Sequence, residues 1–145
     1  MSAIRINPIS VWQDPPFPFN QAVVEPAGRR VHLTGQVAWT SGGELIGAGD
    51  AEMQTEYAIE NIRRILAELG GTLADVMSTT MYYVRDEDLP AIQQVRTRMF
   101  EKATGPAVTG VKVAGLVDPA LLVELTVVAV IPEARFREPA AERLR

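Results

Sequence analysis

The chain has 145 residues, of which 47% are hydrophobic and 22% charged, and its formal net charge is −4. This length suits one domain with a buried core, and no apolar run reaches the length of about 18 residues that predicts a membrane span. The acidic balance argues against nucleic acid as a partner, because binding to its backbone needs a basic surface. The absence of cysteine excludes disulfides and thiolate chemistry, and with an N-terminus unlike a signal peptide it favours a cytoplasmic protein.

The first half of the chain predicts two strands and a helix. Residues 1–19 are rich in proline and aromatic side chains, which indicates an irregular lead-in. Two β-favouring stretches, residues 20–24 and 30–36, flank the turn signal Pro26-Ala27-Gly28, and this pattern predicts a hairpin. Asp50 is a suitable N-cap for a long helix ending at Gly70-Gly71. The apolar residues of this helix fall on one face: Ala58, Ile62, Ile65, Leu66 and Leu69.

The second half predicts three strands and another helix. Residues 76–84 favour a strand, and a helix begins near Asp88 and stops before Gly105. The inward-facing residues of this helix are Ile92, Val95 and Met99. Strands follow at residues 107–113 and 121–131. We therefore predict one α+β domain over residues 1–132, followed by a charged, solvated tail over residues 133–145.

The last predicted strand is apolar on both faces. Val123, Leu125, Val127, Ala129 and Ile131 share one face, while Val128 and Val130 lie on the other with Glu124 and Thr126. Two helices cover only one face of such a sheet, so a second copy of the chain is the simplest cover for the other. Glu124 then lies in an interface, either in an ion pair or as a carboxylate that activates water.

The remaining candidate motifs do not predict a catalytic, metal-binding or phosphate-binding site. The single histidine, His32, lies in a predicted strand and lacks a catalytic arrangement around it. No group of histidines and carboxylates has metal-ligand spacing, so neither a metal nor another cofactor is expected. Gly47-Ala48-Gly49 lacks the lysine of a phosphate-binding loop and indicates a turn.

Several segments, in order, resemble the Rid (YjgF-like) family. They are His32-Leu33-Thr34-Gly35-Gln36, Gln54-Thr55 with Ala58 and Asn61, Thr79-Thr80-Met81-Tyr82, Gly105-Pro106-Ala107, and Val123-Glu124-Leu125. The resemblance spans about residues 18–132. It implies a chorismate-mutase-like α+β fold, in which a mostly antiparallel six-stranded sheet carries two helices on one face. It also implies a homotrimer with pockets between subunits.

The resemblance implies cofactor-free hydrolysis of imines and enamines, but this chain departs from the family at key positions. The family glutamate that positions water corresponds to Glu124, and its strand-end glycine to Gly35. Its carboxylate-binding arginine is replaced by Val108, and its N-terminal tyrosine by Phe19. Gln93 stands where asparagine is frequent, and Gly110 where cysteine is frequent. We expect the pocket to be lined by Phe19, Gly35, Gln93, Val108, Thr109 and Gly110.

Losing the arginine removes a contact worth about 1.5–3 kcal/mol. Lys112 lies roughly 13 Å along the strand from position 108, and the sequence leaves open whether it or Arg85 reaches the pocket. We therefore predict a small neutral or apolar substrate, hydrolysed with the help of Glu124. The alternative is a non-catalytic trimer that binds a metabolite. An endoribonuclease or translation inhibitor is less favoured, because the chain is acidic and lacks a histidine-based acid/base pair.

Overall fold

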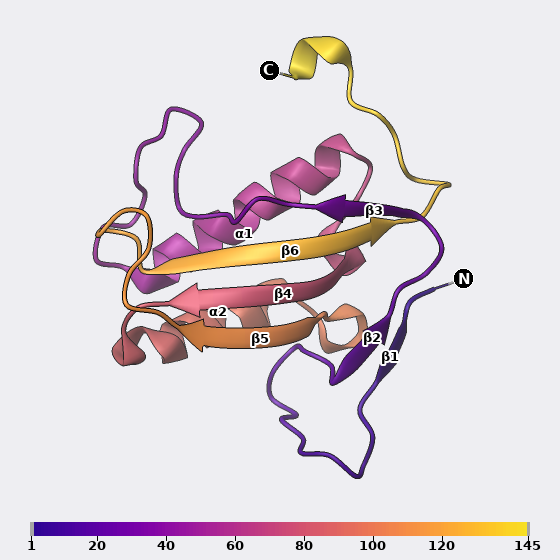
Figure 1. The fold of residues 1–145 in the computed structure, drawn as a ribbon, viewed down its shortest axis with the longest axis horizontal. Coiled ribbons are helices and arrows are strands. Elements are labelled where there is room, and N and C mark those ends of the chain that lie inside the picture. The colour runs from indigo at the N-terminus through magenta and orange to yellow at the C-terminus, as the bar shows by residue number, and fades with distance from the viewer. Residues whose placement is uncertain (1, 145) are drawn as a thin grey trace.

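The computed structural model describes residues 2–144 and has an α+β architecture with two helices on one face of a four-stranded sheet (Figure 1). The strand order is β3 (Arg29–His32), β6 (Val123–Ile131), β4 (Val76–Tyr83) and β5 (Ala107–Lys112). Strand β6 is antiparallel to both of its neighbours, whereas β4 and β5 are parallel. The helices are α1 (Ala51–Glu68) and α2 (Leu89–Met99).

Two further strands form a separate ribbon, so the six strands of the described chain are divided four and two. Strand β1 (Ile4–Ile6) pairs with β2 (Ala22–Val24) in antiparallel register. The predicted hairpin over residues 20–36 is therefore wrong: β2 pairs with β1, and β3 pairs with β6. Residues 1–19 also contain strand β1, which the sequence pattern did not predict because this segment is rich in proline. Local patterns indicate strands, but partners 16 residues or more apart are chosen by tertiary packing.

Helix α1 begins and ends where the sequence predicts. The side chain of Asp50 accepts a hydrogen bond from the backbone N–H of Met53 at 3.0 Å, which satisfies one free donor of the first turn. At the other end Gly70 adopts a φ of +81°, and Gly71 donates to the carbonyl of Leu66 at 2.8 Å. A left-handed residue at this position is typical of a helix C-terminus, and glycine adopts it without strain.

The core lies between the helices and one face of the sheet. The buried side chains of β6 on this face are those predicted: Val123, Leu125, Val127, Ala129 and Ile131. Helix α1 adds Ile59 to the predicted set, while Ile65 and Leu69 are only half-buried. On the other face of β6, Val130 is already buried by its own chain, and Glu124, Thr126 and Val128 are half-buried. That face therefore needs less covering than the sequence pattern suggests.

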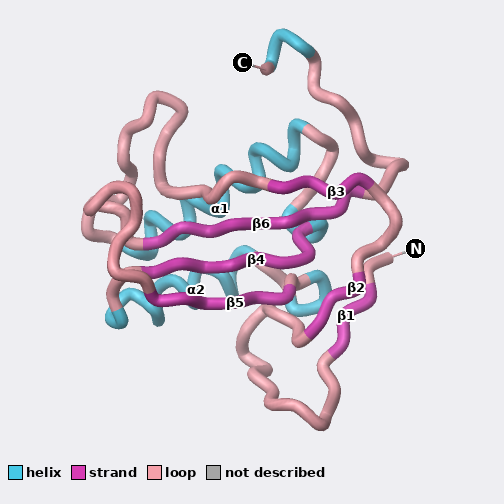
Figure 2. Tube along the Cα trace, viewed as in Figure 1, coloured by secondary structure: helices cyan, strands magenta, loops and turns pink. Residues whose placement is uncertain are grey.

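Two irregular regions are tied to the sheet and helices. The loop between β1 and β2 is long and carries Phe19 (Figure 2). It is anchored by Asn20, whose side-chain amide donates to the carbonyls of Lys102 and Gly105 at 3.0 and 2.9 Å. The C-terminal tail is largely exposed, but it also contacts α1, because Arg137 donates to the carbonyl of Ala67 at 2.9 Å. None of the helices in residues 2–144 combines the length and apolar character needed to cross a membrane.

Four single-turn 3₁₀ helices complete the fold: η1 (Leu73–Asp75), η2 (Asp86–Asp88), η3 (Lys102–Thr104) and η4 (Ala141–Arg143).

Candidate functional site

Four of the predicted site residues surround one cavity on the helix side of the sheet. The cavity measures about 270 Å³, and its walls include Phe19, Gln93, Val108 and Gly110. Val108 and Gly110 face it because they pair with Thr79 and Met81 of β4, and paired residues of parallel strands share a face. Gln93 comes from α2 and Phe19 from the loop between β1 and β2. The remaining walls are Trp12, Asp14, Met81, Tyr83, Leu89 and Arg96.

Glu124 and Gly35 meet on the opposite face of the sheet. Glu124 pairs with Tyr82 in the register of β4 and β6, whereas its neighbour Leu125 pairs with the core residue Met81. Gly35 packs so tightly against Glu124 that an added Cβ would collide with the carboxylate. The contact is with the end of a flexible, half-buried side chain, so a larger residue at position 35 would displace the Glu124 carboxylate. The Glu124 carboxylate is half-buried and makes no hydrogen bond or ion pair with residues 2–144.

Thr109 does not line this cavity, but it lines a neighbouring one together with Phe19 and Val108. It pairs with Thr80, which in turn pairs with Thr126 of β6. Residues 108, 109 and 110 therefore alternate between the two faces, as consecutive residues of a strand must. One chain thus gathers Phe19, Gln93, Val108 and Gly110 around one cavity and Gly35 with Glu124 on the opposite face, while Thr109 shares the neighbouring cavity with Phe19 and Val108.

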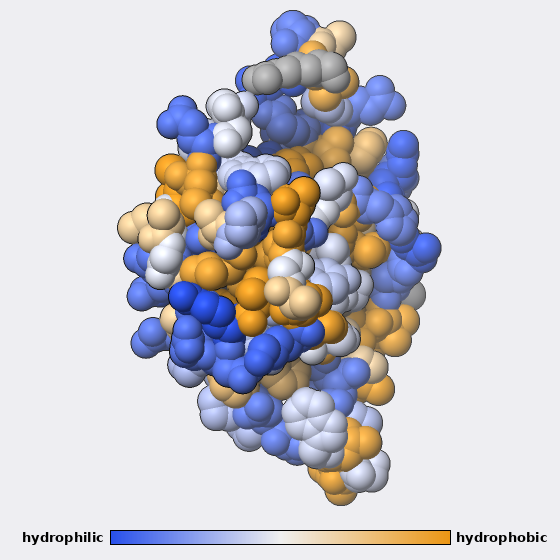
Figure 3. Space-filling view, turned by 60° about the vertical axis from the view of Figure 1, so that its left-hand side comes forward, coloured by the Kyte–Doolittle hydropathy of each residue, from blue (hydrophilic) through white to orange (hydrophobic). Residues whose placement is uncertain are grey.

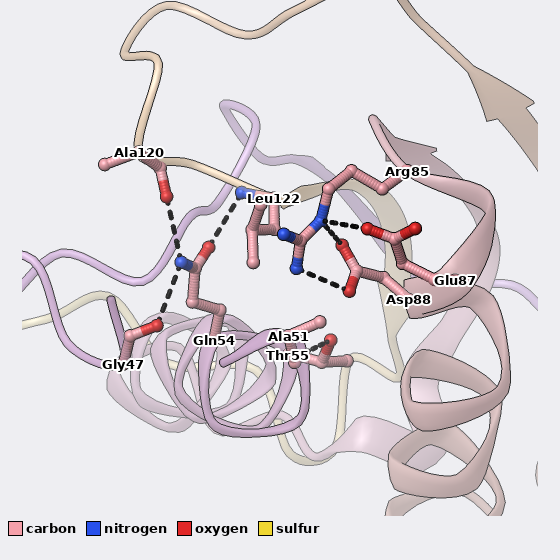
Figure 4. Close-up of polar contacts among 9 residues, drawn as sticks. All are labelled: Gly47, Ala51, Gln54, Thr55, Arg85, Glu87, Asp88, Ala120 and Leu122. Carbon is pink, nitrogen blue, oxygen red and sulfur yellow. Dashed lines mark hydrogen bonds and ion pairs between the residues drawn. The ribbon is translucent and has the colours of Figure 1, made fainter. Parts of the chain in front are cut away.

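Arg85 and Lys112, the two cations that the sequence offered as possible replacements for the family arginine, each pair with a carboxylate outside the cavity. Arg85 donates to the two carboxylate oxygens of Asp88 at 2.7 and 2.8 Å and lies 3.5 Å from Glu87 (Figure 4). Hydrogen bonding to Asp88 raises the pKa of Arg85. Lys112 pairs with Asp86 at 2.9 Å. Neither side chain lines the cavity beside Val108.

A different cation lies in that cavity, and sequence reasoning missed it. Arg96 projects from α2 and is only 4% exposed. It donates to Gln93 Oε1 at 3.0 Å and lies 3.5 Å from Met81 Sδ. Burial lowers the pKa of Arg96 to about 10. The available signal was its spacing, because Arg96 follows the inward-facing Ile92 by four residues and so lies on the same face of the helix.

A buried hydroxyl adds a second polar group near Val108. Thr79 Oγ1 is the one fully buried side-chain oxygen or nitrogen without a partner within residues 2–144. It lies beside a neighbouring cavity of about 230 Å³, whose walls also include Phe19 and Val108. A buried hydroxyl without a partner is costly to the fold, and because this oxygen is fully enclosed it is not exposed to the cavity.

Gln54 of α1 holds the segment that precedes Glu124 through hydrogen bonds from its side chain. Its side-chain amide donates to the carbonyls of Gly47 and Ala120 at 3.1 and 3.0 Å, and its oxygen accepts from Leu122 at 2.9 Å (Figure 4). These bonds fix the segment that leads directly into Glu124. Across the described part of the chain, no three His, Cys, Asp or Glu side chains come close enough to hold a metal ion.

Known proteins match the chain over most of its length. A sequence model of the family described as Endoribonuclease L-PSP matches residues 13–131. A RutC family protein of Synechocystis is 32% identical over 116 residues, which cover 79% of this chain and 87% of the relative. The 3-aminoacrylate deaminase RutC of Acinetobacter baylyi is 35% identical over 99 residues, which cover 68% of this chain and 77% of the relative.

Solved structures agree with the sequence matches. The Rid-family protein YyfB of Yersinia pestis, described as of unknown function, superposes with a TM-score of 0.80 at 33% identity. The superposition covers 90% of this chain and all of that one. A YjgF-family protein of Mycobacterium tuberculosis gives a TM-score of 0.61 at 28% identity, over 77% of this chain and 86% of that one. The shared fold and the match over residues 13–131 place this chain in the YjgF/Rid family.

Proposed function

We propose that the chain is a hydrolase of small imines or enamines, in which Glu124 positions the attacking water without help from a cofactor. The observation that carries this proposal is the state of the Glu124 carboxylate. It is half-buried, closely packed by Gly35, and without a hydrogen-bond or ion-pair partner among residues 2–144. A partly exposed carboxylate that no group of the described chain occupies can hold a water molecule, which favours a role in proton transfer over a purely structural one.

The chemistry needs only one carboxylate and one water molecule. Glu124 accepts a proton from water as the oxygen bonds to the imine carbon, and the nitrogen is protonated in return. The hydroxyl proton of the resulting amino alcohol then passes through Glu124 to the nitrogen as the C–N bond breaks, which releases ammonia and leaves a carbonyl group. An enamine enters the same sequence after it takes up a proton at carbon and becomes an imine. The A. baylyi relative is named a deaminase of 3-aminoacrylate, which contains an enamine.

We further propose that the complete site forms between copies in a homotrimer. The residues of the site are divided between two faces of one sheet, so a single chain cannot bring Glu124 to the cavity beside Val108. A neighbouring copy that presents its Glu124 face to this cavity would join the two halves. Hydrophobic surface bordered by hydrophilic side chains, visible in Figure 3, is also typical of an interaction surface.

The test is Glu124→Gln, which keeps the shape of the side chain and removes its basicity. We expect turnover of an imine generated in the assay to fall about 100-fold or more, while ligand binding and assembly remain. Glu138→Gln, at an exposed position of the tail, is the matched control. If Glu124→Gln weakens only the assembly and leaves turnover unchanged, the chain is instead a non-catalytic binding protein.

A further inference from the structure

Arg96 is a buried cation without an anionic partner. No carboxylate of residues 2–144 lies within 4.0 Å of its guanidinium nitrogens. Its pKa is lowered by burial alone, with no contribution from a neighbouring acid. At neutral pH the side chain is therefore charged, and an unpaired buried charge destabilises a fold unless something else compensates it.

Most of the hydrogen-bonding capacity of Arg96 is unused. A guanidinium has five N–H donors, and only Nη1 has partners among the described residues, at Gln93 and Met81. Among residues 2–144, Thr79 Oγ1 is the one side-chain nitrogen or oxygen that is both fully enclosed and without a partner. The other two nitrogens of Arg96 have no partner either, so they are not fully enclosed. They therefore retain access to open space, and Arg96 lines a cavity.

That cavity is the one beside Val108. Arg96 from α2, Val108 from β5 and Phe19 from the preceding loop lie on its walls together. Gln93 binds Nη1 of Arg96, and this bond helps to fix the orientation of the guanidinium plane. Asp14 is the one acidic residue on the wall, and it forms no ion pair with Arg96. The cavity beside Val108 therefore contains a cation, which is supplied by α2 and not by position 108.

We propose that Arg96 binds the carboxylate of a small organic acid in this cavity. A guanidinium matches a carboxylate through two parallel hydrogen bonds, and such pairs are strongest where water is excluded. The volume of about 270 Å³ lies just below the range of roughly 300–1,000 Å³ common for ligand pockets, so the acid is small. The aromatic walls from Trp12, Phe19 and Tyr83 accept its apolar part.

This inference replaces the neutral substrate indicated by Val108 and Phe19. It rests on the proposed function only in identifying the acid as a substrate, because binding is measured without turnover. If correct, the substrate of the proposed hydrolase carries a carboxylate that is anchored from α2 and not from β5.

The experiment compares two probes that differ in charge, butanoate and butanamide, by NMR titration of the full-length protein. We expect butanoate to bind the unmodified protein at least about tenfold more tightly, a difference within the range of one charge-assisted contact. Arg96→Met should abolish this preference, and Arg96→Lys should restore part of it. Arg98→Met, on the same helix but exposed and paired with Glu56, should leave it unchanged.

Thermal unfolding separates a ligand-binding arginine from a structural one. Removing an unpaired buried charge should raise the Tm of Arg96→Met, whereas loss of a structural contact, including one with another copy, would lower the Tm and leave the preference for butanoate. Equal binding of both probes by the unmodified protein, or an undiminished preference in Arg96→Met, would overturn the proposal. If Arg96→Met fails to fold, Arg96→Lys is the deciding variant. A preference for butanoate over butanamide that is unchanged in Arg96→Lys would contradict anchoring by the guanidinium of Arg96.

The outcomes also distinguish this inference from the proposed function. Carboxylate binding through Arg96 without imine turnover would refute the hydrolase and leave the anchor standing. Hydrolysis that is equally fast for neutral and carboxylate-bearing imines, and insensitive to Arg96→Met, would refute the anchor and leave the hydrolase standing.

Discussion

Each face of the four-stranded sheet carries a charge without a partner among residues 2–144, and the two charges have opposite signs. On the helix side, Arg96 lies in a small aromatic cavity with Val108 and Gln93 and is almost fully buried. On the open side, Glu124 is half-buried against Gly35. Other charged residues of the region, such as Arg85 and Lys112, have partners at 2.7 and 2.9 Å. The contrast supports the proposals that Arg96 binds a ligand and that Glu124 acts at a contact with another copy.

The two charges cannot meet within one chain, because the strands place them on opposite sides of the same sheet. In an assembled site, Arg96 would bind the carboxylate of a small acid and Glu124 would activate a water molecule beside it. A site divided in this way depends on assembly, since each copy then contributes one half to a neighbour.

Gly35→Ala should give the largest effect on this arrangement. The new methyl group would collide with the Glu124 carboxylate, so the carboxylate must move and turnover should fall about 100-fold or more. Imine hydrolysis and Tm are measured in parallel. Gly115→Ala is the control, because nothing lies within 4 Å of the added Cβ there. Full activity of Gly35→Ala would show that the position of Glu124 is not critical.

Mixing two inactive variants tests whether the halves belong to different copies. Glu124→Gln removes the open-face half, and Gly110→Leu fills the helix-side cavity. Co-refolding equal amounts should recover about a quarter of wild-type turnover, because random assembly brings the two intact halves together at a quarter of the interfaces of a ring. Each variant refolded alone should stay inactive. A mixture that stays as inactive as its components would mean that the site lies within one chain.

Gln54→Leu should destabilise the segment that precedes Glu124. It leaves the buried N–H of Leu122 and the carbonyl of Ala120 without the bonds from Gln54, while the carbonyl of Gly47 keeps its bond from the N–H of Asp50. We expect the free energy of unfolding to fall by about 2–3 kcal/mol, measured by urea denaturation. Gln94→Leu is the control at an exposed glutamine of α2. A loss no larger than that of the control would mean that these bonds contribute little to the fold.

Arg135→Gln should have the smallest measurable effect. Arg135 donates to both oxygens of the buried Asp75 at 2.6 and 2.9 Å, and Asp75 keeps its bond from the N–H of Thr72. Because the Arg135 side chain is 45% exposed, water screens the pair, and we expect a loss of only about 1 kcal/mol in unfolding experiments. Arg143→Gln, which breaks an exposed pair with Glu68, should change Tm less. Equal shifts for the two variants would mean that burial of Asp75 is unimportant.

Much of the fold could be predicted from local patterns. The cap at Asp50, the termination at Gly70 and the alternation of β6 each depend on residues within a few positions of one another, and all three are confirmed. The hairpin over residues 20–36 failed because two suitable strands and a turn do not specify that the strands pair with each other. Strand β2 instead pairs with β1, whose residues lie in a segment that proline made resemble a loop.

The site was only partly predictable for a related reason. The family motifs supplied Phe19, Gln93, Val108, Gly110, Gly35 and Glu124, but not the division of these residues between two faces. Arg96 was overlooked because arginine usually lies at a helix surface, and its burial became visible only once α2 was packed on β4.

By itself the sequence determined the family, the α+β class and the absence of an arginine at position 108, because these follow from residue identities and local spacing. Only the tertiary structure decided which cation reaches the cavity and which residues share a face. Those properties depend on how a helix and two strands pack together, and the distance between residues along the chain does not encode that packing.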